Sequence, residues 1–210
     1  FTMAMSNRKV TILDDQQTST LGRASIGFGE ISLVEKVVGY KKIKFYTHEN
    51  AGYGDVRLPD IQMHTTSFWL TVPEALCEEL GMGRAAAIDG LRGIGRALET
   101  VATLALMCDP RDIGQTIEDA QAARVPQSER EGRRSIYEPT AFLFDNVPGG
   151  VGLSERVYER AAELLASARL LIRGCACGEG CPMCVGATEV PDGFRRRAAL
   201  GLMELIMWNA

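Results

Sequence analysis

The sequence contains no run of about 18 or more consecutive apolar residues, so it predicts no membrane-spanning helix. Its first residues also lack the long apolar stretch of a secretory signal peptide. Without an export signal we expect a cytoplasmic, reducing location, where the six cysteines act as thiols rather than as disulfides.

Positive charge is not in excess either, because 23 Lys and Arg face 27 Asp and Glu and the formal net charge is −4. This balance argues against a general attraction of the whole surface to nucleic acid, so any DNA contact would have to be local. Only two histidines occur, His48 and His64, and they do not form the His-Glu-x-x-His pair of zinc hydrolases. We therefore expect structural histidines.

The 210 residues, 46% of them hydrophobic, are enough for a packed core, and no internal repeat divides them. We expect one domain over residues 1–210, with mainly strands in 1–80 and mainly helices in 84–210, which is an α+β fold with an N-terminal antiparallel region. Because the chain starts with Phe1 and has methionines at positions 3 and 5, we expect it to be part of a longer protein.

Alternating side chains predict the strands of the first part. Ile43, Phe45 and Thr47 alternate with polar or aromatic neighbours, which is typical of a half-buried strand. Weaker alternation marks three further candidates, at Val10/Ile12, Ile31/Leu33 and Val56/Leu58.

Apolar residues at helical spacing predict three helices, over Arg84–Met107, Leu153–Ile172 and Phe194–Trp208. Asp109-Pro110 is expected to end the first, because a residue before proline disfavours the α region. A short strand is expected at Thr140–Phe144. The polar stretch Arg111–Glu138 is expected to be an exposed connection.

Four cysteines lie within ten positions, in the spacing Cys175-x-Cys177-x3-Cys181-x2-Cys184. Closed sites of four thiolates are typical of structural zinc, and nearby glycines permit a tight wrap of the loop. Four thiolates on Zn²⁺ carry a formal charge of −2, so we expect Arg173 and backbone N–H groups to compensate it. An iron–sulfur cluster also takes four thiolates and remains the alternative.

One stretch, Lys36–His48, combines basic and aromatic residues. Lysines that bind phosphates and rings that stack on bases are how single nucleic-acid strands are held. The alternative is a strand edge that its lysines keep soluble. A second basic group, at the start of the last predicted helix, serves either DNA or only the helix surface. The candidate DNA contacts are Lys36, Lys41, Lys42, Lys44, Tyr46, Arg195 and Arg196.

The segment Phe144–Gly152, FDNVPGGVG, stands between a predicted strand and a predicted helix, where backbone N–H groups can hold a phosphate. It lacks the Gly-Lys-Ser/Thr ending of a nucleotide P-loop, so it should not bind ATP on its own. We favour a tight turn over a DNA-phosphate contact.

Several stretches together resemble one family: VVGYKKIKFYTHENAGYG, MHTTSFWL, MCDPRDIG, FDNVPGGVGL and CACGEGCPMCVG. They resemble the C-terminal zinc-binding domain of MrfA-type DEAD/DEAH-box helicases, from about Ile26 to Gly186. The resemblance implies that Cys175, Cys177, Cys181 and Cys184 bind one structural zinc. It also implies a parent that is a superfamily 2 ATP-dependent DNA helicase, typically 3′→5′, which acts in DNA repair.

The chain departs from a complete helicase because it has no Walker A motif, no Asp-Glu-x-His motif and no arginine finger. We therefore expect a non-catalytic accessory domain that works with the helicase motor domains and guides single-stranded DNA. A similar domain occurs in phage-defence proteins that partner a separate helicase. The alternative is therefore a protein-interaction module that docks a separate motor without touching DNA.

Overall fold

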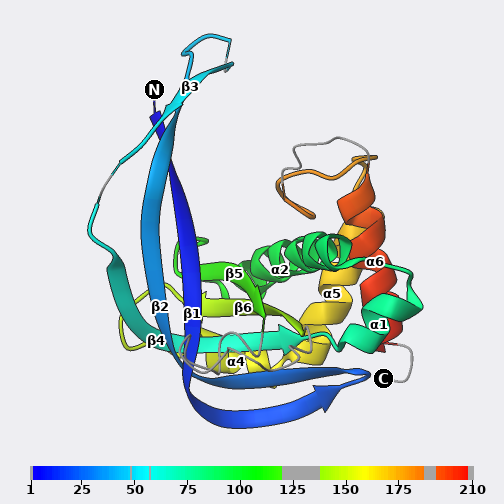
Figure 1. Cartoon of the computed structure of the whole chain (residues 1–210). Coiled ribbons are helices and arrows are strands. Elements are labelled where there is room, and N and C mark those ends of the chain that lie inside the picture. Colours follow the sequence, from blue (N-terminus) through cyan, green and yellow to red (C-terminus); the bar gives the residue numbers. More distant parts are fainter. Residues whose placement is uncertain (1, 48, 57, 120–137, 187–192, 208–210) are drawn as a thin grey trace, which may run out of the picture.

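The computed structural model describes residues 2–47, 49–56, 58–119, 138–186 and 193–207. It is an α+β fold in which a strongly bent antiparallel sheet is covered on one face by helices (Figure 1). The strands are β1 (Thr2–Leu21), β2 (Ala24–Ile43), β3 (Asn50–Gly54), β4 (Ile61–Thr71), β5 (Ile113–Asp119) and β6 (Pro139–Asp145). The helices are α1 (Glu74–Glu79), α2 (Arg84–Leu106), α4 (Leu153–Glu159), α5 (Ala161–Gly174) and α6 (Phe194–Met207).

The sheet has the order β1-β2-β4-β6-β5, and β3 pairs with the far end of β2. Every pair is antiparallel. The first and last strands of this order, β1 and β5, are therefore its two edges.

The hairpin of β1 and β2 is longer than the rest of the sheet, with 20 residues in each strand. Register shifts along β1 interrupt the pairing at three places, and such bulges bend a strand and increase its twist. The last pair between β2 and β4 joins Glu35 to Ile61. Beyond it the hairpin leaves the body as a projecting arm, residues 2–7 and 36–54 without residue 48 (Figure 1).

The main core lies between the sheet and the helices. α2 contributes Leu91, Ile94 and Leu98, and α5 contributes Leu164 and Leu165, all of them fully buried. A smaller cluster fills the opposite, concave side of the sheet and contains Val10, Ile31, Leu33, Trp69, Phe142 and Phe144. Both faces of the bent sheet are thus apolar near its centre.

Two glycines on α2 let α6 pack closely against it. A Cβ on Gly90 would lie 3.0 Å from the Ala198 Cβ, and one on Gly93 would lie 3.1 Å from the Ala199 Cβ. This close packing places the first turn of α6, which carries Arg195 and Arg196, beside α2 and the cysteine loop.

The helical predictions are largely confirmed. The first helix ends at Leu106 with Met107 in the left-handed region, earlier than Asp109-Pro110. The second is divided at Arg160 into α4 and α5, and the same apolar stripe runs through both. The third begins at Phe194 as predicted, while Trp208 lies outside the described residues.

The strand predictions need two corrections. The predicted strand through Phe45 and Thr47 is wrong, because β2 ends at Ile43 and a turn follows, in which Phe45 is 69% exposed. Val56 and Leu58 also lie outside any strand, immediately before Pro59.

The strand at Thr140–Phe144 is confirmed as part of β6. The stretch Arg111–Glu138 is not only a connection, since it contains β5. Residues 120–137 lie outside the described residues.

Candidate metal centre

The four clustered cysteines lie in the loop that joins α5 to the segment before α6. Cys175 is the residue that ends α5, and its N–H donates to the Leu171 carbonyl at 3.1 Å. At the other end of the loop, the N–H groups of Cys184, Val185 and Gly186 all donate to the Cys181 carbonyl, at 3.0 to 3.2 Å. The end of α5 therefore positions the first cysteine, and a turn around Cys184 positions the second pair.

The four sulfur atoms lie within 4.8 Å of one another. The sulfur–sulfur distances are 3.7 Å for Cys175 and Cys181, 3.3 Å for Cys177 and Cys184, and 3.6 Å for Cys181 and Cys184. A tetrahedral zinc with bonds of about 2.3 Å separates its sulfur ligands by about 3.8 Å, so the cluster fits one ion. A four-iron cluster would spread the thiolates more widely, because its own atoms lie between them.

The thiols differ in acidity because their surroundings differ. Backbone N–H groups of Met183 and Cys184 donate to the Cys181 sulfur and lower its pKa to about 7. Burial raises the pKa of Cys184 to about 12, and a hydrogen bond with Cys175 raises the pKa of Cys177. A bound cation would favour the thiolate form at all four positions, because the four sulfur atoms would be its ligands.

Arg196, from α6, holds the first half of the loop. Its guanidinium donates to the carbonyls of Ile172 and Arg173 at 3.2 Å each, and so caps the C-terminus of α5. It also donates to carbonyls of the cysteine loop: Cys175 at 3.2 Å, Gly178 at 3.4 Å, and Cys177.

The prediction that Arg173 compensates the negative charge of the four thiolates is therefore wrong. The Arg173 side chain is exposed and forms no hydrogen bond or ion pair with another described residue, and the guanidinium beside the loop belongs to Arg196. DNA contact by Arg196 stays a prediction, while its observed contacts are structural.

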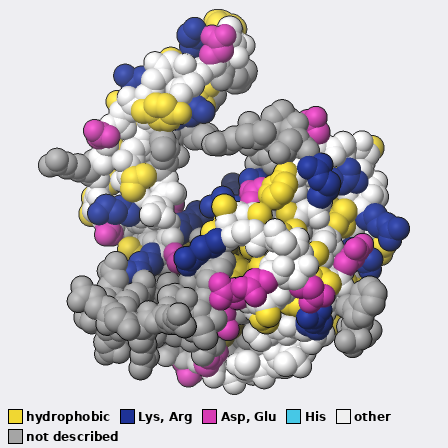
Figure 2. Space-filling view, turned by 45° about the vertical axis from the view of Figure 1, so that its right-hand side comes forward, with side chains coloured by type: hydrophobic (Ala, Val, Ile, Leu, Met, Phe, Trp, Pro, Cys, Tyr) yellow, Lys and Arg dark blue, Asp and Glu magenta, His cyan; other side chains and the backbone are white. Residues whose placement is uncertain are grey.

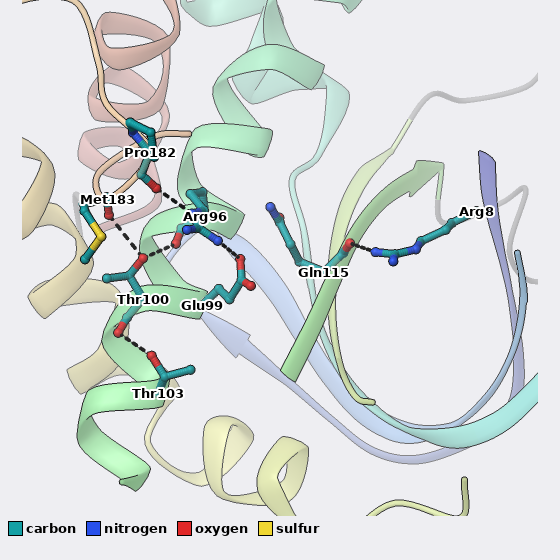
Figure 3. Close-up of polar contacts among 8 residues, drawn as sticks. All are labelled: Arg8, Arg96, Glu99, Thr100, Thr103, Gln115, Pro182 and Met183. Carbon is teal, nitrogen blue, oxygen red and sulfur yellow. Dashed lines mark hydrogen bonds and ion pairs between the residues drawn. The ribbon is translucent and has the colours of Figure 1, made fainter. Parts of the chain in front are cut away.

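α2 holds the second half of the loop (Figure 3). Arg96 Nε donates to the Pro182 carbonyl at 2.7 Å, and Thr100 Oγ1 donates to the Met183 carbonyl at 3.1 Å. In the same loop the backbone of Gly180 has a φ of +118°, and a Cβ there would lie 2.6 Å from Val185 Cγ2. The loop is thus fixed by two helices that are far apart in the sequence.

The turn between β6 and α4 already contains its own anion. The Asp145 carboxylate is fully buried and accepts hydrogen bonds from the N–H groups of Val151, Leu153 and Ser154, at 2.6, 3.1 and 2.8 Å. The Ser154 hydroxyl also bonds to it. The tight-turn interpretation is therefore confirmed, because the N–H groups that a phosphate would need are taken.

The predicted basic and aromatic stretch lies on the projecting arm. Lys41 and Lys42 are neighbours in β2, so their side chains point to opposite faces, and Lys42 lies 5.9 Å from the Tyr40 ring. Tyr46 is 90% exposed at the tip. Lys36 and Lys44 form ion pairs with Asp60 and Glu49, at 3.9 and 2.8 Å.

Arg195 lies apart from the arm, in the first turn of α6. It forms a partly buried ion pair with Asp89 of α2, at 2.6 Å. The candidate DNA residues thus form two groups, one on the arm and one beside the cysteine loop.

The fold and the cluster together define a class: an α+β domain with a closed site of four thiols and no spare ligand position, which is the pattern of structural zinc. Among the described helices, none has the length and apolar composition needed to cross a bilayer.

Residues 94–185 match the family described as the MrfA Zn-binding domain, so this part of the chain carries a zinc-binding domain of the MrfA type. The matched residues include all four cysteines, Arg96 and Thr100, whereas Arg196 lies beyond them. The family and the four-cysteine cluster support one structural zinc ion.

Relatives extend the similarity over the rest of the chain. The uncharacterized ATP-dependent helicase YprA of Bacillus subtilis (strain 168) is 31% identical over 196 residues, which are 93% of this chain and 24% of that protein. The ATP-dependent helicase HRQ1 of Saccharomyces cerevisiae is 24% identical over 77% of this chain and 15% of its own.

The chain is also similar to a crystal structure of the DUF1998 helicase MrfA bound to DNA, with a TM-score of 0.68 and 27% identity. This match covers 98% of this chain and 25% of the MrfA chain. A second MrfA crystal structure gives a TM-score of 0.56 at 25% identity. The chain therefore spans about a quarter of the length of YprA and of MrfA.

Proposed function

We propose that this chain is a zinc-ordered accessory domain of a superfamily 2 ATP-dependent DNA helicase that acts in DNA repair. Cys175, Cys177, Cys181 and Cys184 are its zinc ligands. The observation that carries the proposal is the four-sulfur cluster inside the region that matches the MrfA Zn-binding domain. Relatives described as ATP-dependent helicases supply the motor context.

In this proposal zinc has a structural task. Four thiolates complete its coordination and leave no position for water or substrate, so the ion orders the loop and does no chemistry. The ordered loop joins α2, α5 and α6 through Arg96, Thr100 and Arg196. A cytoplasmic location belongs to the same proposal, because a reducing compartment keeps the thiols available for the metal.

The domain also guides single-stranded DNA beside the motor. The arm supports this role, because it projects from the body and carries lysines together with exposed rings, including Tyr46 and Phe45. Lys41 and Lys42 are free of ion pairs with other described residues. They should therefore carry more of the phosphate contact than Lys36 and Lys44, which have acidic partners.

Binding of a fluorescein-labelled single strand to the purified 210-residue chain tests this role. Replacing Lys41, Lys42 and Lys44 by Gln should weaken binding and reduce its salt dependence by about 0.7 for each phosphate that no longer has a cationic partner. Lys9→Gln is the control for the loss of one lysine charge, because Lys9 is an exposed lysine outside the arm. If the chain binds no single strand at low salt, the guiding role is wrong and only the zinc-ordered structure remains.

A docking module for a helicase motor is the second candidate. Exposed apolar side chains favour it at the end of α2 and in the cysteine loop, where Leu104, Met107 and Met183 are 74%, 92% and 57% exposed. Purified motor domains of the same parent should bind this face after nuclease treatment. Abolition of that binding in Met107→Asp, with unchanged DNA binding, would identify docking as a separate function.

A further inference from the structure

The two edges of the sheet face each other beside the base of the arm. β1 and β5 are the first and last strands of the sheet order, yet Arg8 Nη1 of β1 donates to the Gln115 carbonyl of β5 at 3.5 Å. Figure 3 shows Arg8 reaching across this space from β1 toward Gln115. The bent sheet therefore approaches closure and leaves an open seam between its edge strands.

A groove with a volume of about 570 Å³ lies at this seam. Its walls come from elements that are distant in the sequence: β1, β5, α2, the end of the cysteine loop and α6. Figure 2 shows the space between the arm and the body, with Lys and Arg side chains gathered along its lower edge. Its lining includes Arg8, Arg92, Arg96, Arg195, Gln115 and Glu118.

Positive charge dominates the lining of this groove. Among the described residues that line it, four are arginines and one, Glu118, is acidic, although the chain as a whole has a net charge of −4. Three of the arginines have carboxylate partners, Glu35, Glu99 and Asp89, and none of these three carboxylates lines the groove. These ion pairs hold the guanidinium groups in place, which preorganises them for an anion.

Guanidinium donors remain available beside these ion pairs. Arg8 and Arg96 each use Nε and Nη1 in their hydrogen bonds, and neither Nη2 bonds to a described residue. Arg92 is exposed and forms no ion pair with a described residue. The groove thus offers N–H groups from several arginines, which suit phosphate oxygens better than a lysine would.

We propose that this groove binds the sugar-phosphate backbone of one nucleic-acid strand. The inference deepens the proposed DNA-guiding function and rests on it, because it supplies a track from the arm to the zinc loop. Arg96 connects the groove to the cysteine loop, because it lines the groove and donates a hydrogen bond to the Pro182 carbonyl of the loop. Zinc removal would therefore disturb the groove through Arg96.

A peptide strand added to the β5 edge fits the groove less well. Arg8 already occupies the Gln115 carbonyl, which an added strand would need for its ladder. An added strand would offer the four arginines only uncharged carbonyl acceptors, which bind guanidinium groups more weakly than phosphate oxygens do. A polyanion with regularly spaced charges satisfies more of the available donors.

Charge reversal at Arg92 is the first test, on the complete 210-residue chain with a labelled oligothymidylate of roughly 20 nucleotides. Arg92→Glu should raise the Kd about tenfold at low salt and reduce the salt slope by about 0.7 or more. Arg156→Glu is the matched control, because Arg156 is an exposed arginine on α4 outside the groove and the change in net charge is the same. Equal effects at the two positions would overturn the proposal, since they would reflect net charge alone.

Cross-linking locates the strand independently of affinity. A photoreactive phenylalanine at Ser6 or Thr116, both in the groove lining, should cross-link to the oligonucleotide, and one at Glu155 on α4 should not. Cross-links from position 46 at the arm tip without any from 6 or 116 would overturn the groove and leave the proposed function intact. If the wild-type chain binds no strand, both fail together.

Competition distinguishes a nucleic-acid strand from an acidic peptide. Unlabelled oligothymidylate should displace the probe, whereas polyglutamate of the same charge should compete about tenfold less well or worse, because carboxylates do not match the phosphate spacing. Equal competition by the two polymers would overturn the assignment of a nucleic-acid ligand.

Discussion

Replacing Arg196 with Met tests how the zinc loop is held. Methionine keeps the apolar stem of the side chain and removes the guanidinium, which donates to five carbonyls: Ile172, Arg173, Cys175, Cys177 and Gly178. A hydrogen bond to a charged group contributes about 1.5–3 kcal/mol, but such bonds are not additive and partly exposed carbonyls regain water. We expect the free energy of unfolding to fall by about 3–5 kcal/mol.

Thermal unfolding in the presence of zinc measures this change. For a domain of this size 1 kcal/mol shifts Tm by about 2–4 °C, so Arg196→Met should lower it by about 10 °C. Zinc should also leave the variant faster in competition with a chelator, because the loop is no longer tied to α6. The Tm of Arg196→Lys should lie between those of the wild type and Arg196→Met, because one ammonium group cannot reach both the α5 carbonyls and the loop carbonyls.

Arg173→Met is the matched control, because Arg173 adjoins the same loop and its exposed side chain has no hydrogen-bond partner among the described residues. It should change stability by less than about 0.5 kcal/mol. If Arg196→Met has the same stability as Arg173→Met and retains zinc equally well, Arg196 does not hold the cysteine loop in the way proposed here.

Three further predictions concern the same structure. Asp145→Asn should cost about 2–4 kcal/mol in chemical denaturation, because the buried carboxylate binds three N–H groups, and a cost below about 1 kcal/mol would contradict this. Gly180→Ala should destabilise the loop by about 1–3 kcal/mol, measured by Tm, because its φ is +118° and Val185 leaves no room, whereas Gly178→Ala meets no atom within 4 Å. Zinc affinity should rise with pH by about one log unit per pH unit for each displaced proton, because Cys184 with its pKa of about 12 is protonated in the metal-free protein. The slope of log zinc affinity against pH should be larger below pH 7, because Cys181 with its pKa of about 7 also binds a proton there. A zinc affinity that does not depend on pH would rule out thiolate ligation.

The cysteine cluster could be predicted from the sequence because its ligands are local. Two pairs within ten positions, with glycines between them, leave few ways to arrange the backbone, and the four sulfurs do meet. The helices α2 and α6 could be predicted equally well from their apolar stripes, because helical periodicity is a property of one segment.

The side chains that hold the loop could not be predicted in this way. Arg196 reaches the end of α5 only because α6 returns across α2 at Gly90 and Gly93, whereas Arg173, which is nearer in sequence, is exposed. The groove at the seam has the same origin, because Arg8 and Arg96 meet there through tertiary packing.

The basic stretch shows a different limit. Its composition was clear, but a strand sends Lys41 and Lys42 to opposite faces, and the chain turns after Ile43 instead of continuing as a strand. β5 was missed because this edge strand is largely polar and adjoins a charged segment, so little apolar alternation marks it.

Elemental analysis of the purified 210-residue chain and of its Cys184→Ser variant tests whether the four cysteines bind one zinc ion. We expect one zinc and no iron per wild-type chain, and both zinc loss and a lower Tm in the variant. A wild-type chain that is fully folded with no bound metal, or that contains iron in place of zinc, would contradict this expectation.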